Sequence, residues 1–206
     1  MRIVLTGFAP FGSNAENASS IAVRTLEELW NSTDKLRDSP INLTLVVNIP
    51  VTYRDVLETL QSIWSQNPDL VVHVGVNAHI QSVALETRAF NGIYDHPGVD
   101  HCSCDHNGLC IPDGADVLCC QLDLNRTFDV LVSKALPVVL SDNPGLYLCG
   151  FIYYLSLSRA PDRSVFIHVP PVSSNMTARD LAVILFEIIQ DLGNQLGLPV
   201  PNVTFS

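Results

Sequence analysis

A continuous apolar run at residues 70–75, with the sequence LVVHVG, limits the folds open to this chain more than any other segment. A strand that is apolar on both faces must be covered on both sides, and such strands are typical of parallel sheets between two layers of helices. Elsewhere, strand-like segments alternate with segments whose apolar residues recur at helical spacing. The pattern therefore predicts an α/β fold, in which residues 1–206 form a single-domain α/β/α sandwich around a mainly parallel, mixed and twisted sheet.

The predicted elements follow one another without an internal repeat or a linker. Ser20, Thr52 and Thr177 are suited to cap three helices, and residues 31–40 are expected to form a polar loop. We expect strands at residues 2–7, 43–50, 70–75, 82–90, 135–140 and 164–171, and helices at residues 20–30, 52–64, 123–134, 144–159 and 177–192.

The composition fits an ordered globular protein and excludes several kinds of partner. Apolar residues make up 47% of the chain and charged residues only 16%. With 206 residues, the chain is also long enough to bury one substantial core. The net charge of −10 argues against nucleic acid and anionic membranes, because both bind basic surfaces. No apolar run approaches the roughly 18 residues of a membrane-spanning helix, and the chain starts with a strand pattern instead of a signal peptide. We therefore expect a cytoplasmic protein.

Residues 91–120 read as an irregular insertion rich in cysteine. The spacing of these cysteines does not match the paired Cys-x-x-Cys motifs of zinc ribbons, so we predict no metal site and no cofactor. Whether they form disulfides or bind metal stays open at this point. The five are Cys102, Cys104, Cys110, Cys119 and Cys120.

The sixth cysteine, Cys149, lies outside this group, in a segment that combines a polar corner with a helical pattern. Asp142 or Asn143 is expected to cap a helix over residues 144–159, with Pro144 in its first turn. Unpaired N–H groups and the positive end of the helix dipole would favour a thiolate near that start. The alternative is a thiol that is simply packed in the core.

A thiol hydrolase also needs a base and a group that orients this base. His168 lies near the carboxyl end of a predicted strand, the edge at which open α/β sheets place their sites. Glu86 lies on another predicted strand and could accept a hydrogen bond from its ring. A strand histidine is more often a satisfied core residue, and a strand carboxylate more often faces solvent from an edge strand. The residues alone leave open whether the three groups meet.

The turn after the first strand, GFAPFG at residues 7–12, contains two phenylalanines. Phe8 and Phe11 either fill the core or line a pocket at the carboxyl end of the strand. The motif G-x-G-x-x-G is absent, so this turn is not a dinucleotide fingerprint.

Four separated segments resemble the signatures of the pyroglutamyl-peptidase I family and occur in the same order as in that family. The resemblance covers nearly the whole chain and is closest to the animal members, which carry a Cys-rich segment where bacterial members have a different loop. NAS at residues 17–19 and HVG at residues 73–75 fit as well. The four segments are GFAPFG at 7–12, LE at 85–86, GLYLC at 145–149 and FIHVP at 166–170.

The resemblance implies a cysteine exopeptidase that removes an N-terminal pyroglutamyl (5-oxoproline) residue from small peptides. Cys149 would be the nucleophile, His168 the base and Glu86 the group that orients it, in a monomer or small homo-oligomer. The substrate-binding residues would be Phe8, Phe11, Asn17, Gly75 and Val76.

One departure from the family concerns the oxyanion. Bacterial members carry an arginine followed by Ile-Pro-Asp after the glutamate strand, whereas residues 91–95 contain no arginine and Arg88 is not an obvious replacement. Two alternatives remain at this point: a thiol hydrolase or transferase of different acyl specificity, and a non-catalytic or metal-binding α/β module.

Overall fold

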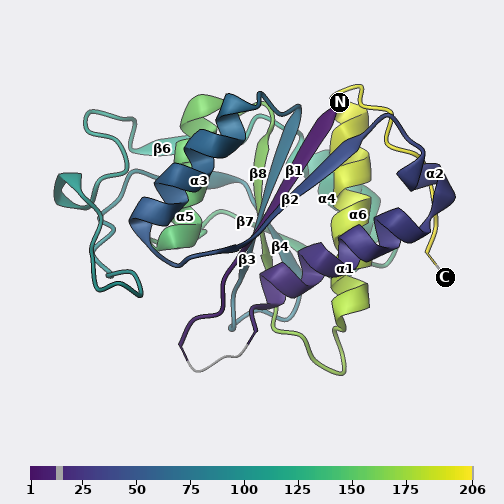
Figure 1. The fold of residues 1–206 in the computed structure, drawn as a ribbon, viewed down its shortest axis with the longest axis horizontal. Coiled ribbons are helices and arrows are strands. Elements are labelled where there is room, and N and C mark those ends of the chain that lie inside the picture. The colour runs from purple at the N-terminus through teal and green to yellow at the C-terminus, as the bar shows by residue number, and fades with distance from the viewer. Residues whose placement is uncertain (13–15, 206) are drawn as a thin grey trace.

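The computed structural model describes residues 1–12 and 16–205, and its centre is a six-stranded mixed sheet (Figure 1). The strand order is β2-β1-β3-β8-β4-β7. The first four of these strands run parallel, whereas β4 is antiparallel to β8 and parallel to β7. The strands are β1 (Arg2–Phe8), β2 (Asn42–Ile49), β3 (Leu70–Val76), β4 (Val83–Glu86), β7 (Val138–Ser141) and β8 (Ser164–Val169).

Helices cover both faces of this sheet, which confirms the predicted α/β/α sandwich (Figure 1). One layer contains α1 (Ala18–Ser32), α4 (Leu124–Ser133) and α6 (Ala178–Gln195), and the other contains α3 (Tyr53–Ser65) and α5 (Leu148–Arg159). Within the described residues, none of the helices has the length and apolar character needed to span a bilayer. That residues 1–206 form one domain stays a prediction.

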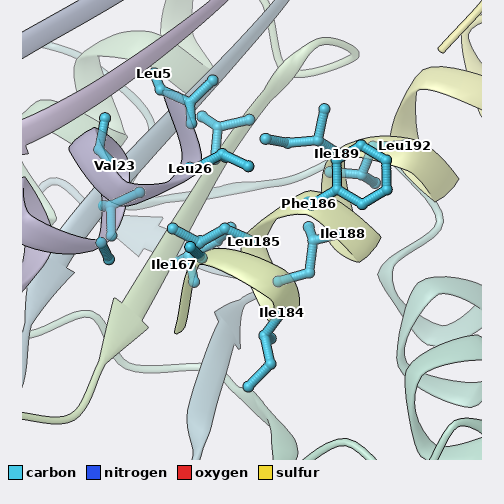
Figure 2. Packing of buried hydrophobic residues seen from close by; sticks show 14 of the residues in the cluster. Leu5, Val23, Leu26, Ile167, Ile184, Leu185, Phe186, Ile188, Ile189 and Leu192 are labelled. Atoms are coloured by element: carbon cyan, nitrogen blue, oxygen red, sulfur yellow. The ribbon is translucent and has the colours of Figure 1, made fainter. Parts of the chain in front are cut away.

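The larger core lies between the sheet and the layer of α1 and α6. Leu5 of β1 and Ile167 of β8 lie in a cluster to which α6 also contributes many side chains (Figure 2). All of these side chains are fully or almost fully buried. Those on α6 recur with the 3.6-residue period that predicted the last helix. Those labelled on α6 are Ile184, Leu185, Phe186, Ile188, Ile189 and Leu192.

The second core surrounds α5. This helix is covered on two opposite sides, by the sheet and by the Cys-rich segment, and most of its residues are accordingly apolar. The Tyr153 hydroxyl donates to the carbonyl of Glu86 in the sheet at 2.7 Å. The neighbouring Tyr154 hydroxyl donates outward to the carbonyl of Ala115, in the Cys-rich segment, at 2.6 Å. The helix that carries Cys149 is therefore held between the sheet and residues 88–119.

Two of the three predicted caps are correct, and two helix starts differ from expectation. Thr52 and Thr177 cap α3 and α6, but α1 begins at Ala18 and is capped by Asn17. Ser20 lies inside this helix, and its hydroxyl donates to the carbonyl of Phe8. The segment 31–40, predicted as a loop, contains the short helix α2 (Asp34–Arg37).

The helix α5 begins at Leu148, four residues later than the predicted start at Pro144. Neither expected cap is used. The Asn143 side chain accepts from the N–H of Gly145 instead, and Gly145 has a left-handed φ of 79°. This turn prevents a helical continuation from Pro144, so Cys149 is only the second residue of the helix.

The predicted strand at 82–90 is wrong as a single element, because it divides between two sheets. After β4 the chain turns into β5 (Arg88–Phe90), which pairs antiparallel with β6 (Val117–Cys119). Thr87 joins the two sheets: its N–H donates to the carbonyl of Ser141, and its carbonyl accepts from Cys120. The Cys-rich segment is thus not wholly irregular, since it contains β6 and a 3₁₀ turn, η1 (His106–Gly108).

The strand predicted at 135–140 begins later, at Val138. Ala135 cannot belong to it because its φ of 56° is left-handed and forms the turn that ends α4.

Candidate active site

His168 and Glu86 lie on neighbouring strands, on the face of the sheet that α5 covers. In the antiparallel pair of β8 and β4, His168 is opposite Ala84 and Glu86 is opposite Phe166. Opposed residues share a face, and so do alternate residues of one strand. The ring of Phe166 lies 5.9 Å from that of Tyr153 on α5, which identifies the face.

These two side chains form a buried hydrogen-bonded pair. His168 Nδ1 lies 2.7 Å from Glu86 Oε1, and the side chains are 6% and 2% exposed. A carboxylate can only accept, so Nδ1 carries the proton and Nε2 is left for other partners. Glu86 is therefore not on the solvent side of an edge strand, as the majority of strand carboxylates would be.

Cys149 meets this pair at the first turn of α5. Its thiol interacts with the His168 side chain, and its Sγ lies directly over Gly75. A Cβ added at Gly75 would be 2.9 Å from Sγ, and Gly75 is the β3 neighbour of His168. The structure therefore brings together all three residues that the sequence singled out.

The ionisation of His168 reflects opposing influences. Burial by itself lowers the pKa of the imidazole, but hydrogen bonds to Cys149 and Glu86, and their charges, raise its pKa to about 9. At neutral pH the imidazole is thus protonated, and it stands between the sulfur and the carboxylate. The second carboxylate oxygen, Glu86 Oε2, is buried and has no hydrogen-bond partner among the described residues.

A second histidine on this face, His73, has a different role from His168. It is completely buried, and its ring nitrogens contact Thr6 Oγ1 at 2.9 Å and Ser156 Oγ at 2.7 Å. Burial lowers its pKa to about 3, so it is neutral and joins β1, β3 and α5 beneath the site. The HVG segment pointed to this residue, but the sequence did not reveal its contacts.

Three of the five residues expected to bind substrate line one cavity of about 580 Å³, which we call the Phe11 cavity. They are Phe11, Asn17 and Val76. Phe11 is 38% exposed there, whereas Phe8 is buried in the core beside α5. Gly75 lies next to Val76, under the sulfur of Cys149. Phe8 and Gly75 are thus not part of the lining.

Asn17 has most of its hydrogen-bonding capacity in use within the protein. Its side-chain oxygen accepts from the N–H and hydroxyl of Ser19, and its amide nitrogen donates to the carbonyl of Ala9. It therefore fixes the wall of the Phe11 cavity and the start of α1 together.

The Cys-rich segment is attached beside the start of α5. The hydroxyls of Tyr147 and Tyr53 donate to the carbonyls of Pro97 and His96 at 3.2 and 2.9 Å. Farther along the segment, the Asn91 side chain accepts from the N–H of Ile111 and donates to its carbonyl.

Arg88, which is not an obvious replacement for the bacterial arginine by sequence, has its own partner. It forms an ion pair with Asp142, in the loop that leads to Cys149. In the described part of the chain, no group of three or more His, Cys, Asp or Glu side chains could hold a metal ion. All six cysteines lie in this part and are free.

An α/β sandwich with a thiol at a helix start, a buried imidazole and a buried carboxylate has the architecture of a cysteine hydrolase. A family model described as pyroglutamyl peptidase matches residues 1–184. The chain belongs to the pyroglutamyl peptidase family, which confirms the resemblance read from its four segments and makes it a cysteine peptidase. The alternative of a non-catalytic or metal-binding module is not favoured.

Individual relatives agree with this membership. The chain is 38% identical over 194 residues to rat pyroglutamyl-peptidase 1, covering 92% of this chain and 88% of the rat protein. It is 30% identical over 183 residues to human pyroglutamyl-peptidase 1-like protein, covering 88% of this chain and 92% of that protein.

Solved structures show the same fold. Pyrrolidone carboxyl peptidase from Pyrococcus furiosus aligns with a TM-score of 0.81 at 21% identity, covering 95% of this chain and 100% of that one. The enzyme of the same name from Fervidobacterium islandicum gives 0.80 at 24% identity, covering 94% and 99%.

Proposed function

We propose that this chain hydrolyses the amide bond after an N-terminal pyroglutamyl residue of small peptides, through a thioester acyl-enzyme. The observation that carries the proposal is the 2.7 Å contact between His168 Nδ1 and Glu86 Oε1, which directs the rest of the imidazole toward Cys149. The names of the relatives support the acyl group. Cys149 is the nucleophile, His168 the acid and base, and Glu86 the residue that orients the imidazole.

In this mechanism the thiol proton of Cys149 passes to His168 Nε2 before the attack, which the raised pKa of the imidazole favours. The sulfur of Cys149 attacks the pyroglutamyl carbonyl, and the N–H groups at the start of α5 stabilise the oxyanion. His168 gives its proton to the departing amine as the C–N bond breaks. The neutral imidazole then takes a proton from water as the water oxygen attacks the thioester; the C–S bond breaks, and the thiolate of Cys149 and the protonated His168 are restored.

The Phe11 cavity is the proposed pocket for the lactam ring. The pairing of β1 with β3 ends at Gly7 and Val74, whereas Gly75 and Val76 still pair with β8. The lactam amide would therefore bind the backbone groups that face the β1 side at this end of β3. Phe8 would support this wall from the core. Glutamate or glutamine at this position would bury a charged amine without a partner, which is costly.

The same proposal includes location and assembly. Free thiols at all six cysteines suit a reducing compartment such as the cytoplasm. The proposed catalytic groups all come from one chain, so the site needs no second subunit, and we infer a monomer or a small homo-oligomer.

Hydrolysis of a pyroglutamyl-coumarin amide tests the proposal directly. We expect Cys149→Ala to lose at least about a thousandfold in kcat/KM, and the exposed-thiol control Cys119→Ala to keep the activity of the unmodified protein. Prolyl-, leucyl- and glutaminyl-coumarin amides should be poor substrates. Equal rates for Cys149→Ala and the unmodified protein would refute the mechanism, and equal rates for all acyl groups would refute the specificity.

A further inference from the structure

Beside the His168–Glu86 pair, the surface over β4 and β7 is hollowed into a space of about 550 Å³, which we call the β4–β7 depression. The strand register places four of its residues on the same face as His168, because Ala84 pairs with both His168 and Val139, and Glu86 pairs with Ser141. The residues that line it are Asn77, Ile80, Ala84, Glu86, Thr87, Val139, Leu140, Ser141 and Asp142.

This part of the sheet face is accessible although it adjoins a buried pair. Val139 is 41% exposed even though it lies inside a strand. The buried atom Glu86 Oε2 lacks a hydrogen-bond partner among the described residues, and Glu86 is one of the residues that line the depression. The depression therefore offers apolar and polar surface beside a residue of the proposed catalytic machinery.

The order of the strands shows on which side of the reacting groups this depression lies. Across the sheet, the order is β3, β8, β4 and β7. The Cys149 sulfur lies over Gly75 of β3, and His168 follows on β8. The Phe11 cavity is on the side of β3 and α1, through Val76 and Asn17. The β4–β7 depression is on the opposite side of the imidazole.

A peptide that reacts here must place its scissile carbonyl carbon at the sulfur and its scissile nitrogen at His168 Nε2. With the lactam ring in the Phe11 cavity, the chain that follows the nitrogen leads away from β3, over β8 and toward β4. We propose that the β4–β7 depression binds the side chain of the residue that follows pyroglutamate. This assignment rests on the proposed function.

The charges in the depression determine which side chains it accepts. Glu86 is paired with His168, and Asp142 at the edge is paired with Arg88. Each carboxylate already has a cationic partner, so a charged side chain entering the depression finds no free counter-charge and loses hydration. Ile80, Ala84 and Val139 instead offer apolar contact. The second residue of a good substrate is therefore uncharged and apolar, such as leucine, in preference to glutamate or lysine.

Reversal of charge at the floor tests this assignment. The substrates are pGlu-Leu-Gly, pGlu-Glu-Gly and pGlu-Lys-Gly, and the proteins are the unmodified chain, Val139→Lys and Val139→Glu. The matched controls are Val132→Lys and Val132→Glu, because Val132 is 49% exposed on α4, in the layer on the other face of the sheet. Folding is checked by thermal unfolding, and exposure of position 139 makes both charges tolerable.

We expect the unmodified protein to favour leucine over either charged residue by about tenfold in kcat/KM. Val139→Lys should raise the ratio of glutamate to lysine substrate by about tenfold, and Val139→Glu should lower it by a similar factor. The two Val132 variants should leave the ratio within about twofold, since screening weakens distant charges.

Two different failures can be told apart. If the unmodified protein hydrolyses no pyroglutamyl peptide and no pyroglutamyl-coumarin amide, the proposed function is refuted and the assignment falls with it. If it hydrolyses them but the ratio does not follow the sign of the charge at position 139, or follows position 132 equally, only the assignment of the depression is refuted.

Discussion

Gly75 shows how a missing side chain positions a reactive one. The nearest atoms to a Cβ at this position are Phe166 Cζ at 2.7 Å and Cys149 Sγ at 2.9 Å. The backbone here is extended within β3, so the requirement for glycine comes from space and not from a special φ. The sulfur occupies the room that any other residue would fill, and this fixes its distance from the neighbouring strand.

Gly75→Ala should therefore reduce activity through displacement of the sulfur. A shift of about 1 Å at a reacting atom costs on the order of a hundredfold in rate, so we expect a loss of that size in kcat with pyroglutamyl-coumarin amide. Phe166→Leu in the Gly75→Ala background relieves only the clash with the ring. Stability should then recover while activity stays low; recovery of both would show that the sulfur was not displaced.

At the scale of elements, the sequence predicts types better than ends. The spacing of apolar residues in the sequence predicted the buried strands and the apolar face of α6, because both depend on local periodicity. The start of α5 depends on which N–H group the Asn143 side chain accepts from. It accepts from the N–H of Gly145 and not from the helix, and the local sequence pattern does not show which of the two hydrogen bonds forms. The division of residues 82–90 depends on Thr87 bonding to two distant segments.

Substitution of two helix caps, Thr177 and Asn17, should distinguish an effect on stability alone from an effect on both stability and substrate binding. Thr177 caps α6 in a reciprocal capping box with Asp180, and it has no part in the proposed mechanism. Asn17 caps α1 and also lines the Phe11 cavity. Thr177→Ala should cost about 1 kcal/mol of unfolding free energy without a change in KM. Asn17→Ala should cost at least as much and also raise KM for pyroglutamyl-coumarin amide. Urea unfolding and steady-state kinetics measure the two effects, and parallel behaviour of both variants would contradict the role of Asn17 in the cavity wall.

At the scale of the whole molecule, two buried histidines respond to pH in opposite ways. His168 has a pKa raised to about 9, and His73 has a pKa lowered to about 3, against an unfolded value of about 6.5. Above pH 6.5 the folded protein binds more protons than the unfolded one at His168, so stability falls as pH rises toward 9. Below pH 6.5 the unfolded protein binds more protons at His73, so stability falls as pH decreases toward 3.

We therefore expect a maximum of unfolding free energy near pH 6.5, with slopes on either side of at most about 1.4 kcal/mol per pH unit from each histidine. Urea midpoints from about pH 5 to pH 7.5 measure this, below the range in which ordinary thiols titrate. Glu86→Gln removes a negative charge that raises the pKa of His168 while keeping a hydrogen-bond acceptor, so the alkaline slope should shrink while the acid slope remains. An unchanged alkaline slope would mean that Glu86 does not hold the proton on His168.

The limits of sequence prediction follow the same scales. Cys149, His168 and Glu86 could be named from motifs, because each motif is short and contiguous. The β4–β7 depression could not, because it results from the register of three strands and from the face that α5 leaves uncovered. Arg88 likewise has a partner, Asp142, that is 54 residues distant in sequence, and a linear pattern does not indicate such a pair.

The reversed direction of β4 places a strict condition on the chain. Because β4 runs against β8, Glu86 is delivered alongside Phe166, deeper in the sheet than His168, and reaches the imidazole from the protein interior. A slip of this pairing by one residue would turn Leu85 or Thr87 toward the ring and send the acid to the opposite layer. Register fidelity between two short strands is thus as necessary to the chemistry as the acid itself.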